Sequence, residues 1–534
     1  MAHWKRISVC LLGTSLLLSA CSKGDSGSPA PSNSPGGTGQ AQATQKPKLT
    51  LNWFIAANQN ASLPAGDKDF VKKTIEEKFN VDLKIQHLAL GTDYTNKLNL
   101  LLSGGTPPDL MVTDGRASNN YIVDQVVADL TKYVTPQTMP NYFKYWTNEA
   151  EVKQYQVQGV YKRAPLGFAR QLYTSYYIRK DWLDKLNLKI PETYDEMIEV
   201  MKQFTFNDPD GNGKNDTFGM SAAGGGSAIP GDFPEFYKHQ AYVGSLVDGD
   251  QYIDTRTDLR MEKVLNDLKK TLDMKIIDPD WFLNKAGQQI DKAAQGKIGI
   301  VISGARDAAL DNYPNSLQKK TKDVTGVKTA DWQPFHPWAK EGVNMLPAPG
   351  NPFMFSVKAS EDKIKRSVEI LDWLASEEGF LLTHYGVEGR DYKKNGNKIE
   401  VVPDAYKANI TDNGSFLDIY GFFTPIEPEV FKFEIMDPRE TDRDRAILAK
   451  LKSYKYYDAL GTSLTVGPGI DLAAMRAQMN KLQTKILFEE KDASNWPKYR
   501  QELMTKYAAK EIFEGYAQQV GTARGKTLKF KSEN

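Results

Sequence analysis

Residues 206–219, FNDPDGNGKNDTFG, place oxygen-bearing side chains at alternate positions of one short polar loop. Counted from the first aspartate, the odd positions one to nine are Asp208, Asp210, Asn212, Lys214 and Asp216. Side-chain oxygens at one, three and five, a main-chain carbonyl at seven and a glycine at six are features of a calcium-binding EF-hand loop. Hard oxygen ligands without His or Cys favour Ca²⁺ over zinc. The spacing therefore predicts a structural calcium site.

The match to an EF-hand is incomplete in two ways. Position twelve, which carries a bidentate glutamate in an EF-hand, is Gly219. A helix is predicted before the loop, but the sequence FGMSAA after it does not continue as one, so this is not the helix–loop–helix of a calcium sensor. A metal here would fix the end of the preceding helix and would not perform chemistry. The alternative is an Asp/Asn/Gly turn that needs no metal.

The amino-terminal residues form the three zones of a secretory signal, predicted to span 1–20. HWKR is basic, ISVCLLGTSLLL is an apolar run too short for a permanent membrane span, and LSAC ends the segment at Cys21. Leu-Ser-Ala-Cys resembles the bacterial lipoprotein box, which implies that Cys21 is lipidated and anchors the chain. The alternative is an ordinary signal peptide followed by a chance cysteine.

Residues 21–47 are rich in Ser, Gly, Pro and Gln, which predicts a flexible tether between the lipid and a folded body. The only other cysteine, Cys10, lies inside the signal. The mature chain therefore has no disulfide and no thiolate metal site. The whole chain has 534 residues and a formal charge of +1, so it is long enough for a two-lobed body and has no overall field for nucleic acid.

Hydrophobic periodicity predicts strands and helices in alternation, and hence an α/β protein with a mostly parallel sheet. The first strands are expected at 48–54, 81–88 and 107–115, with helices at 67–80 and 93–105. A strand and then a helix follow in 171–190, and Thr193 with Glu196 forms the capping box of a helix over 191–204. The later elements are expected to be strands at 296–303 and 352–359, a helix at 363–386 and a helical tail at 471–519, broken at 495–497.

The order of several segments resembles the extracellular solute-binding lipoproteins of bacterial carbohydrate ABC importers, especially the large oligosaccharide- and alginate-binding members. Besides the lipoprotein box, the segments are KLNLLLSGGTPPDLMVTDG, LYTSYYIRKDWLDKLNLKIPETYDEMIEVMKQF, AAQGKIGIVIS and VEILDWLASEEGFLLTHYGVEGRDY. The resemblance implies a two-lobed, periplasmic-binding-protein-like α/β fold with hinge strands and an interlobe cleft. Lobe 1 would comprise 48–165 and about 350–405, and lobe 2 would comprise 166–349 and about 406–534.

The same resemblance implies a function and partners. The protein would be a monomer, lipid-anchored on the outer face of the cell membrane, that captures an oligosaccharide by hinge closure and delivers it to ABC permease subunits. It would not be an enzyme and would not bind nucleic acid. Solute-binding relatives with a calcium loop often carry an acidic residue after the last aspartate, where this chain has Thr217. That departure concerns the coordination of the metal.

Sugars present C–H faces to aromatic rings and hydroxyls to carboxylates, amides and Arg, and such side chains are expected where strands end. The candidate ligand-binding residues are Trp53, Asn58, Asp114, Arg116, Arg170, Tyr173, Tyr177, Asp232, Phe233, Trp281, Arg306, Trp332, Trp338, Glu388 and Arg390. Alternation along a strand puts Tyr173 and Tyr177 on one side. Trp332 and Trp338 belong to DWQPFHPW, which predicts an aromatic loop punctuated by proline. Each candidate has an alternative as a core aromatic or a surface charge.

Two other functions remain open from the sequence. A secreted polysaccharide hydrolase would need two placed carboxylates, and the acidic pairs at Glu377 with Glu378 and Glu427 with Glu429 are too common a pattern to indicate one. The sequence contains no G-x-S-x-G, H-E-x-x-H or Walker motif. A peptide or nucleoside carrier on the same fold is the second alternative, because a fold does not determine its ligand.

Overall fold

The computed structural model describes residues 46–57, 61–113, 117–154, 161–167, 169–345, 351–457, 460, 464–467 and 469–532. The chain divides into two units after Pro47, and the fold below is that of the second unit, from Lys48 onward. The predicted signal, the predicted lipidation site Cys21 and nearly all of the predicted tether lie outside the described residues. Among the helices in the described ranges, none is both long and apolar enough to cross a membrane.

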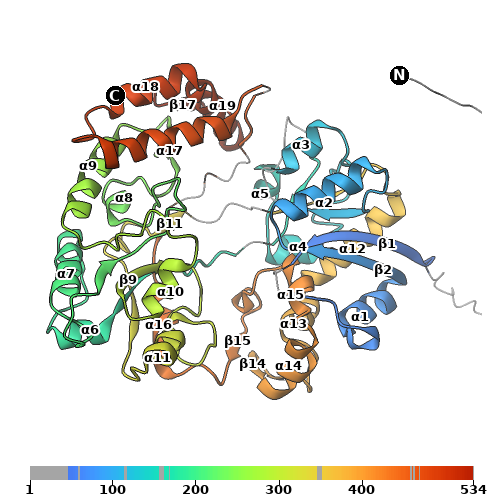
Figure 1. Ribbon diagram of the computed structural model, residues 1–534. Helices are drawn as coiled ribbons and strands as arrows, with labels where there is room; N and C mark the ends of the chain where they lie inside the picture. The colour runs from blue at the N-terminus through green and yellow to red at the C-terminus, as the bar shows by residue number, and fades with distance from the viewer. Residues whose placement is uncertain are drawn as a thin grey trace, which may run out of the picture. The chain divides into compact units, whose positions relative to one another are not determined.

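The first lobe is built on a five-stranded sheet with the order β2-β1-β3-β12-β4. Figure 1 labels β1 and β2 of this sheet. Its strands are β1 (Leu49–Ala56), β2 (Val81–Leu88), β3 (Leu110–Val112), β12 (Pro352–Phe355) and β4 (Ala164–Pro165). β1 runs parallel to β2 and β3, whereas β12 runs antiparallel to β3 and β4. The predicted strand–helix–strand–helix–strand start is confirmed. Later segments complete the sheet: β12 runs opposite to β1–β3, whereas β4, being antiparallel to β12, runs in their direction.

Helices of the first lobe pack beside this sheet, and α1 and α12 contact β2 and β1 respectively (Figure 1). They are η1 (Gly66–Lys68), α1 (Phe70–Phe79), α2 (Thr92–Ser103), α3 (Ala117–Val123), α4 (Pro140–Tyr145), α5 (Glu149–Gln154), α12 (Glu361–Leu374), α13 (Glu377–Tyr385), α14 (Pro403–Asn409), η2 (Thr411–Asn413), α15 (Leu417–Tyr420), η3 (Gly421–Phe423) and η4 (Pro428–Phe431). A small sheet joins β13 (Tyr392–Asn395), β14 (Lys398–Val401) and β15 (Glu434–Met436).

The prediction of one helix over 363–386 is wrong, because the chain forms α12 and α13 with a break between them. The Ser376 hydroxyl accepts a hydrogen bond from the amide of Gly379 and so caps a new helix. A Cβ on Gly379 would lie 2.6 Å from the Cα of Leu374, so only glycine permits this tight turn. The apolar periodicity continues across the break, which is why the sequence pattern did not reveal it.

The second lobe contains a four-stranded sheet with the order β10-β5-β9-β6. Its strands are β10 (Trp332–Phe335), β5 (Ser175–Arg179), β9 (Ile298–Ser303) and β6 (Phe218–Met220). β5 runs antiparallel to both β10 and β9, and only β6 and β9 are parallel. The predicted aromatic loop at DWQPFHPW is therefore wrong in its first half, which is an edge strand. Pro334 is tolerated there because an edge strand pairs on one side only.

The remaining elements of the second lobe surround this sheet or extend it. They are α6 (Lys180–Lys185), α7 (Tyr194–Phe206), α8 (Pro234–Lys238), α9 (Arg260–Asp273), α10 (Gln288–Ala294), α11 (Leu317–Thr325), α16 (Asp442–Lys452), α17 (Leu472–Glu489), α18 (Trp496–Lys506), α19 (Ala509–Arg524), β7 (Ser245–Asp248), β8 (Gln251–Asp254), β11 (Asn344–Met345), β16 (Tyr456–Tyr457) and β17 (Lys529–Phe530). The capping box of α7 is confirmed, since Thr193 and Glu196 cap each other's backbone amides. The helical tail and its break before α18 are also confirmed.

The hydrophobic core shows how the chain returns to each lobe. One cluster of buried side chains combines residues 51–166 with 353–433. Two further clusters combine residues 176–343 with 447–530. Residues 406–433 thus pack with the first lobe, although the sequence analysis assigned them to the second. The predicted division into lobes stays a prediction. The composition of the buried clusters favours a final crossing from the first lobe to the second after Phe433.

Candidate functional site

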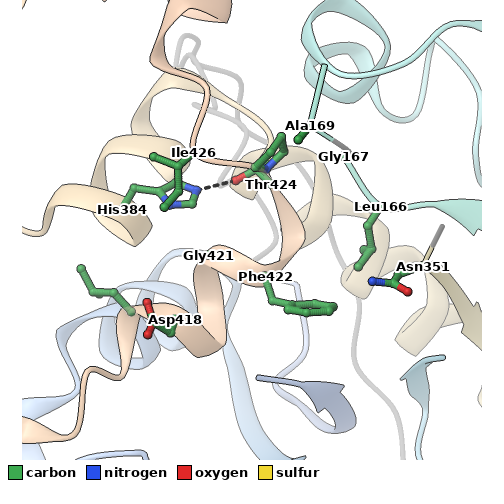
Figure 2. Close-up of a pocket in the computed structure, with 12 residues that line it drawn as sticks. Leu166, Gly167, Ala169, Asn351, His384, Asp418, Gly421, Phe422, Thr424 and Ile426 are labelled. Atoms are coloured by element: carbon green, nitrogen blue, oxygen red, sulfur yellow. Dashed lines mark hydrogen bonds between the residues drawn. The ribbon is translucent and has the colours of Figure 1, made fainter. Parts of the chain in front are cut away.

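A pocket of about 350 Å³ lies where the chain passes between the two lobes (Figure 2). Its lining comes from the segment after β4, the residue before β12, helix α13, and the run from α15 through η3. The lining residues are Leu166, Gly167, Ala169, Asn351, His384, Leu417, Asp418, Gly421, Phe422, Thr424, Pro425 and Ile426. The pocket therefore combines a ring and aliphatic groups with an amide, a carboxylate and a hydroxyl, which are groups that can contact a sugar.

The only ring nitrogens in this lining belong to His384, which is neutral. Burial lowers the pKa of His384 to about 3, although its contact with Thr424 acts in the opposite direction. Its Nε2 lies 2.9 Å from the Thr424 hydroxyl, the contact dashed in Figure 2. A Cβ on Gly421 would lie 2.9 Å from the imidazole, so glycine lets the ring approach the backbone. The imidazole thus orients a hydroxyl and brings no charge to the pocket.

A second group of candidate residues is an aromatic stack on the second lobe. The ring of Tyr237 is nearly parallel to that of Tyr242, with centroids 4.0 Å apart, and to that of Trp338 at 5.7 Å. Tyr457 in β16 tilts against Tyr242 at 6.0 Å. Tyr237 is buried, whereas Tyr242, Trp338 and Tyr457 are only half-buried. These three rings therefore keep part of their surface for contact with an amphipathic ligand.

The groups behind the aromatic stack hold it in place. His336 is buried against Tyr176 and Tyr237, and burial lowers its pKa to about 3, so it is a neutral packing partner. The Tyr242 hydroxyl donates to the Gly342 carbonyl at 2.9 Å, which fixes its ring. Burial raises the pKa of Asp232, close to these tyrosines, to about 6, although the charge of Arg256 lowers it. The stack therefore adjoins a carboxyl group that changes charge near neutral pH.

The segments that pass between the lobes are held by specific hydrogen bonds. The Glu427 carboxylate accepts the backbone amides of Arg170 and Gln171, the latter at 2.7 Å, and burial raises its pKa despite these bonds. The Tyr456 hydroxyl accepts the Leu172 amide at 3.1 Å and donates to the Leu172 carbonyl at 2.6 Å. Residues of both lobes thus fix the crossing segment before β5.

Three predicted ligand residues lie at or beside these crossings, and all have partners. Arg170 forms an ion pair with Glu151 at 2.6 Å. Arg306 forms an ion pair with Glu440 at 2.6 Å. Burial raises the pKa of Tyr173, which is half-buried and interacts with Arg306. Tyr173 precedes β5, so the alternation that was expected to align it with Tyr177 does not apply.

Several other predicted ligand residues lie in the core instead. Trp53, Tyr177, Phe233, Trp281 and Trp332 are all at most 5% exposed. The indole N–H groups of Trp53 and Trp332 donate to Ser367 at 3.2 Å and to Thr321 at 2.8 Å. Because all five rings are enclosed, these side chains have no surface with which to contact a sugar in this conformation.

The remaining predictions fall elsewhere on the chain. Glu388 and Arg390 are exposed beside α13, where Arg390 pairs with Asp391 at 2.6 Å and lies 4.7 Å from the Phe70 ring centroid. Asn58, Asp114 and Arg116 lie outside the described residues. Of the fifteen candidates, only Trp338 belongs to the aromatic stack, with Asp232 beside it. No candidate lines the pocket at the crossing, whose residues come from four separate segments.

The loop after α7 is organised by its own aspartates. The Asp208 carboxylate accepts the backbone amides of Gly211, Asn212 and Gly213 at 2.9–3.0 Å. The Asn212 side-chain amide donates to Asp210 at 2.8 Å and to Asp216 at 3.0 Å. Within the described residues, no group of three or more His, Cys, Asp or Glu side chains has the geometry of a metal site. In this conformation the polar groups of the loop therefore hydrogen-bond to one another, as in an Asp/Asn/Gly turn.

The donor chemistry of this loop nevertheless fits a hard cation. The Asp210 and Asp216 carboxylates both accept hydrogen bonds from the Asn212 side-chain amide, so two carboxylates gather at one group of the loop. Carboxylate and amide oxygens are the ligands that Ca²⁺ prefers. Partial burial raises the pKa of Asp210, and the neighbouring Asp208 and Asp216 carboxylates contribute to this rise. Thr217 stands directly after the last aspartate, where an acidic residue would be expected. It is buried and donates its hydroxyl to the Phe204 carbonyl at 2.7 Å. Thr217 is therefore used for packing the loop onto α7.

Comparison with other proteins gives consistent matches. The model of the family described as bacterial extracellular solute-binding protein matches residues 57–379. The polygalacturonan/rhamnogalacturonan-binding protein YtcQ of Bacillus subtilis (strain 168) is 30% identical over 377 residues, which is 68% of this chain and 71% of that protein.

Two solved structures share the fold. An HMO binding ABC-transporter associated solute binding protein from Bifidobacterium longum infantis has a TM-score of 0.69 at 17% identity and covers 90% of this chain and 99% of its own. A FusA EF-hand mutant from S. pneumoniae in complex with fructo-nystose has a TM-score of 0.61 at 16% identity and covers 89% and 99%. The predicted two-lobed, periplasmic-binding-protein-like α/β fold is confirmed by this likeness.

Proposed function

Because this chain belongs to the bacterial extracellular solute-binding protein family, we propose that it captures an oligosaccharide for an ABC importer. The observation that carries the proposal is the stack of Tyr237, Tyr242 and Trp338, in which two rings keep exposed surface. Flat amphipathic rings suit the C–H faces of sugars. The names of the relative and of both structural neighbours, which refer to polygalacturonan/rhamnogalacturonan, HMO and fructo-nystose, support the same ligand class.

In this proposal the aromatic stack and the crossing pocket bind different parts of the sugar. The aromatic stack of the second lobe holds sugar faces, and Asn351, Asp418 and Thr424 of the crossing pocket accept or donate hydrogen bonds to hydroxyls. Hinge motion at the crossings would close the lobes over the sugar and present a distinct form to the permease. No step of this cycle needs a catalytic group, so the protein acts as a binder and not as an enzyme.

The proposed location of the protein at the membrane rests on its amino-terminal sequence. We propose that Cys21 carries the lipid, that residues 21–47 are the tether, and that the body is displayed as a monomer on the outer face of the cell membrane beside its permease subunits. Export is supported by the family, whose description is extracellular. Labelling of the expressed chain with a radioactive fatty acid, compared with Cys21→Ser, tests the anchor.

We also propose that the 206–219 loop binds Ca²⁺ as a structural clip. Asp208, Asp210, Asn212 and Asp216 would supply side-chain oxygens and Lys214 its carbonyl. When bound, the ion would supply charge neutralisation to the clustered carboxylates. Its role would be to hold the end of α7 against β6, since Thr217 and Gly219 already connect the loop to these elements. The structural neighbour FusA, of which an EF-hand mutant has been solved, supports this proposal.

A glycan panel tests the proposed function directly. Purified protein with Ca²⁺ is screened by thermal shift against neutral and acidic oligosaccharides, peptides and nucleosides, and hits are measured by isothermal titration calorimetry. Saturable binding of an oligosaccharide, weakened in Tyr242→Ala and unchanged in Phe488→Ala, is expected, because Phe488 is an exposed ring outside the stack. Stabilisation by peptides or nucleosides alone would contradict the ligand class. Shorter sugar products on chromatography would contradict the binding role and favour a hydrolase.

A further inference from the structure

A basic pocket on the second lobe shares no residue with the crossing pocket or the aromatic stack. Its volume is about 650 Å³, and it lies where the end of α8, the start of α9, α18 and the residues after β17 meet. Five cationic side chains line it: Lys238, Arg260, Lys263, Arg500 and Lys531. Asp258 and Glu262 are the carboxylates of the same lining. The excess of cations makes the pocket a candidate site for an anion.

The lining of this pocket includes a buried guanidinium. Arg500 is 7% exposed, and its Nε and two terminal nitrogens donate to the carbonyls of Thr257, Ser532 and Lys531 at 3.0, 2.9 and 3.1 Å. Among the described residues no carboxylate oxygen lies within ion-pair distance of it, and Asp258 and Asp254 act on it only from farther away. A guanidinium has five N–H donors, so two remain for a further acceptor. Burial of a charge that lacks a close counter-ion is unfavourable unless an anion joins it.

The carboxylates around the pocket are too few to give each of its other cations a separate ion pair. Asp258 pairs with Arg260 at 2.8 Å and is also the carboxylate nearest to Lys531, at 3.9 Å. Lys238 pairs with Asp267 at 2.9 Å, and Asp267 also contacts His239 of the lining at 2.9 Å and Lys270 outside it at 3.1 Å.

Lys263 is exposed, and among the described residues no ion pair involves it. When Asp267 is added to the two lining carboxylates, the residues that the structure describes still place five cations against three anions, an excess of two positive charges.

We propose that this pocket binds a phosphate-class oxyanion. Arg presents its N–H groups in a planar fork that matches phosphate oxygens, and Lys adds point charges around it. The excess of two positive charges among the described residues suits a group that carries about −1.5 to −2 at neutral pH. The amino end of α9, a helix of fourteen residues, adds a favourable dipole on the same side of the pocket. The pocket is larger than one ion, so the oxyanion can belong to a larger molecule.

The test uses the whole protein in a phosphate-free buffer. Isothermal titration calorimetry with inorganic pyrophosphate, inorganic phosphate and glycerol phosphate separates the inorganic ions from an organic monoester, with ionic strength held constant by NaCl. Saturable binding of at least one of these is expected. The double variant Lys263→Gln/Lys531→Gln should bind it at least about tenfold more weakly, because each lysine supplies a charged hydrogen bond. Lys510→Gln on α19, outside the lining, is the matched control and should leave the affinity unchanged.

A second measurement keeps the outcome clear. The thermal midpoints of the ligand-free variants should match that of the natural chain, since both lysines lie at the pocket rim and not in the core. No saturable binding by the natural chain would overturn the proposal, as would an affinity that the double variant retains in full. The oligosaccharide affinity of the double variant should be unchanged, so this test and that of the proposed function fail independently.

Discussion

Replacing Gly219 with glutamate is expected to destabilise the protein and to leave its calcium affinity unimproved. The substitution supplies the residue that an EF-hand carries at position twelve, so loop sequence alone predicts tighter binding. The structure predicts otherwise, because a Cβ on Gly219 would lie 2.6 Å from the Cα and 2.8 Å from the carbonyl oxygen of Met201. Carbon atoms in contact need about 3.5–4.0 Å, so β6 and α7 must separate by about 1 Å.

The cost of that separation follows from what it disturbs. Overpacking at a buried position costs about 1–3 kcal/mol. The Gly219 amide also donates to the Ile276 carbonyl at 2.9 Å and to the Thr205 hydroxyl at 3.0 Å, and weakening each bond adds about 1 kcal/mol. The sum is about 3–5 kcal/mol of unfolding free energy. For a lobe of this size the thermal midpoint should fall by about 10 °C.

Gly219→Ala separates the steric effect from the added carboxylate. Differential scanning calorimetry of both variants at fixed Ca²⁺ should show similar losses of stability, because the Cβ alone causes the clash. Gly515→Ala is the matched control, since only the Gln519 amide lies as near as 4.0 Å and a helical glycine gains about 0.5–1 kcal/mol on becoming alanine. A Gly219→Ala midpoint within 1 °C of the natural chain would refute the packing argument. Tighter Ca²⁺ binding by Gly219→Glu without loss of stability would refute it too.

Three other substitutions address binding, pH and metal. Trp338→Ala should weaken oligosaccharide affinity by about 2 kcal/mol in calorimetric titration, as expected for a central aromatic contact. Asp232→Asn should stabilise the protein by about 1–3 kcal/mol at pH 7.5 and by nothing at pH 4, measured by urea unfolding. The pKa of Asp232 is raised from 3.8 to about 6 by burial, so the natural chain loses stability as the pH rises between these values. Asp208→Asn should abolish the rise in thermal midpoint of about 1–4 °C that millimolar Ca²⁺ gives the natural chain.

Each of these has a contrary result. Equal sugar affinity in Trp338→Ala would remove the stack from the binding surface. A constant stabilisation by Asp232→Asn from pH 4 to 7.5 would show that packing and not ionisation is responsible. A calcium response that persists in Asp208→Asn, or that EGTA does not reverse in the natural chain, would place the effect outside the loop.

Local signals predicted local structure well. The capping box at Thr193 and the apolar stripe after it specify α7 within one stretch of chain, and both were visible in the sequence. The alternation of β1 and β2 likewise predicted their positions closely. The break between α12 and α13 was missed because it depends on one serine cap inside a continuous apolar pattern. Fold elements were therefore predictable wherever neighbouring residues decided them.

Site residues were harder to predict because distant residues decide them. Nothing near Trp332 in the sequence shows that Thr321 will accept its N–H and enclose it, and Trp53 depends in the same way on Ser367. Tyr242 became part of an aromatic stack only because α8 and the segment after β10 meet. The choice between core and binding surface for an aromatic side chain is thus a property of tertiary packing.

The place of β12 in the first sheet has a consequence for how the protein is made. Phe353 pairs with Val112, so the first sheet cannot be finished until the strands of the second lobe's own sheet have been synthesised. Pairing across so long a loop is slow to form, and the free edge of β3 stays open in the meantime. During that delay the unpaired edge of β3 is a site at which partly folded chains can pair with one another and aggregate.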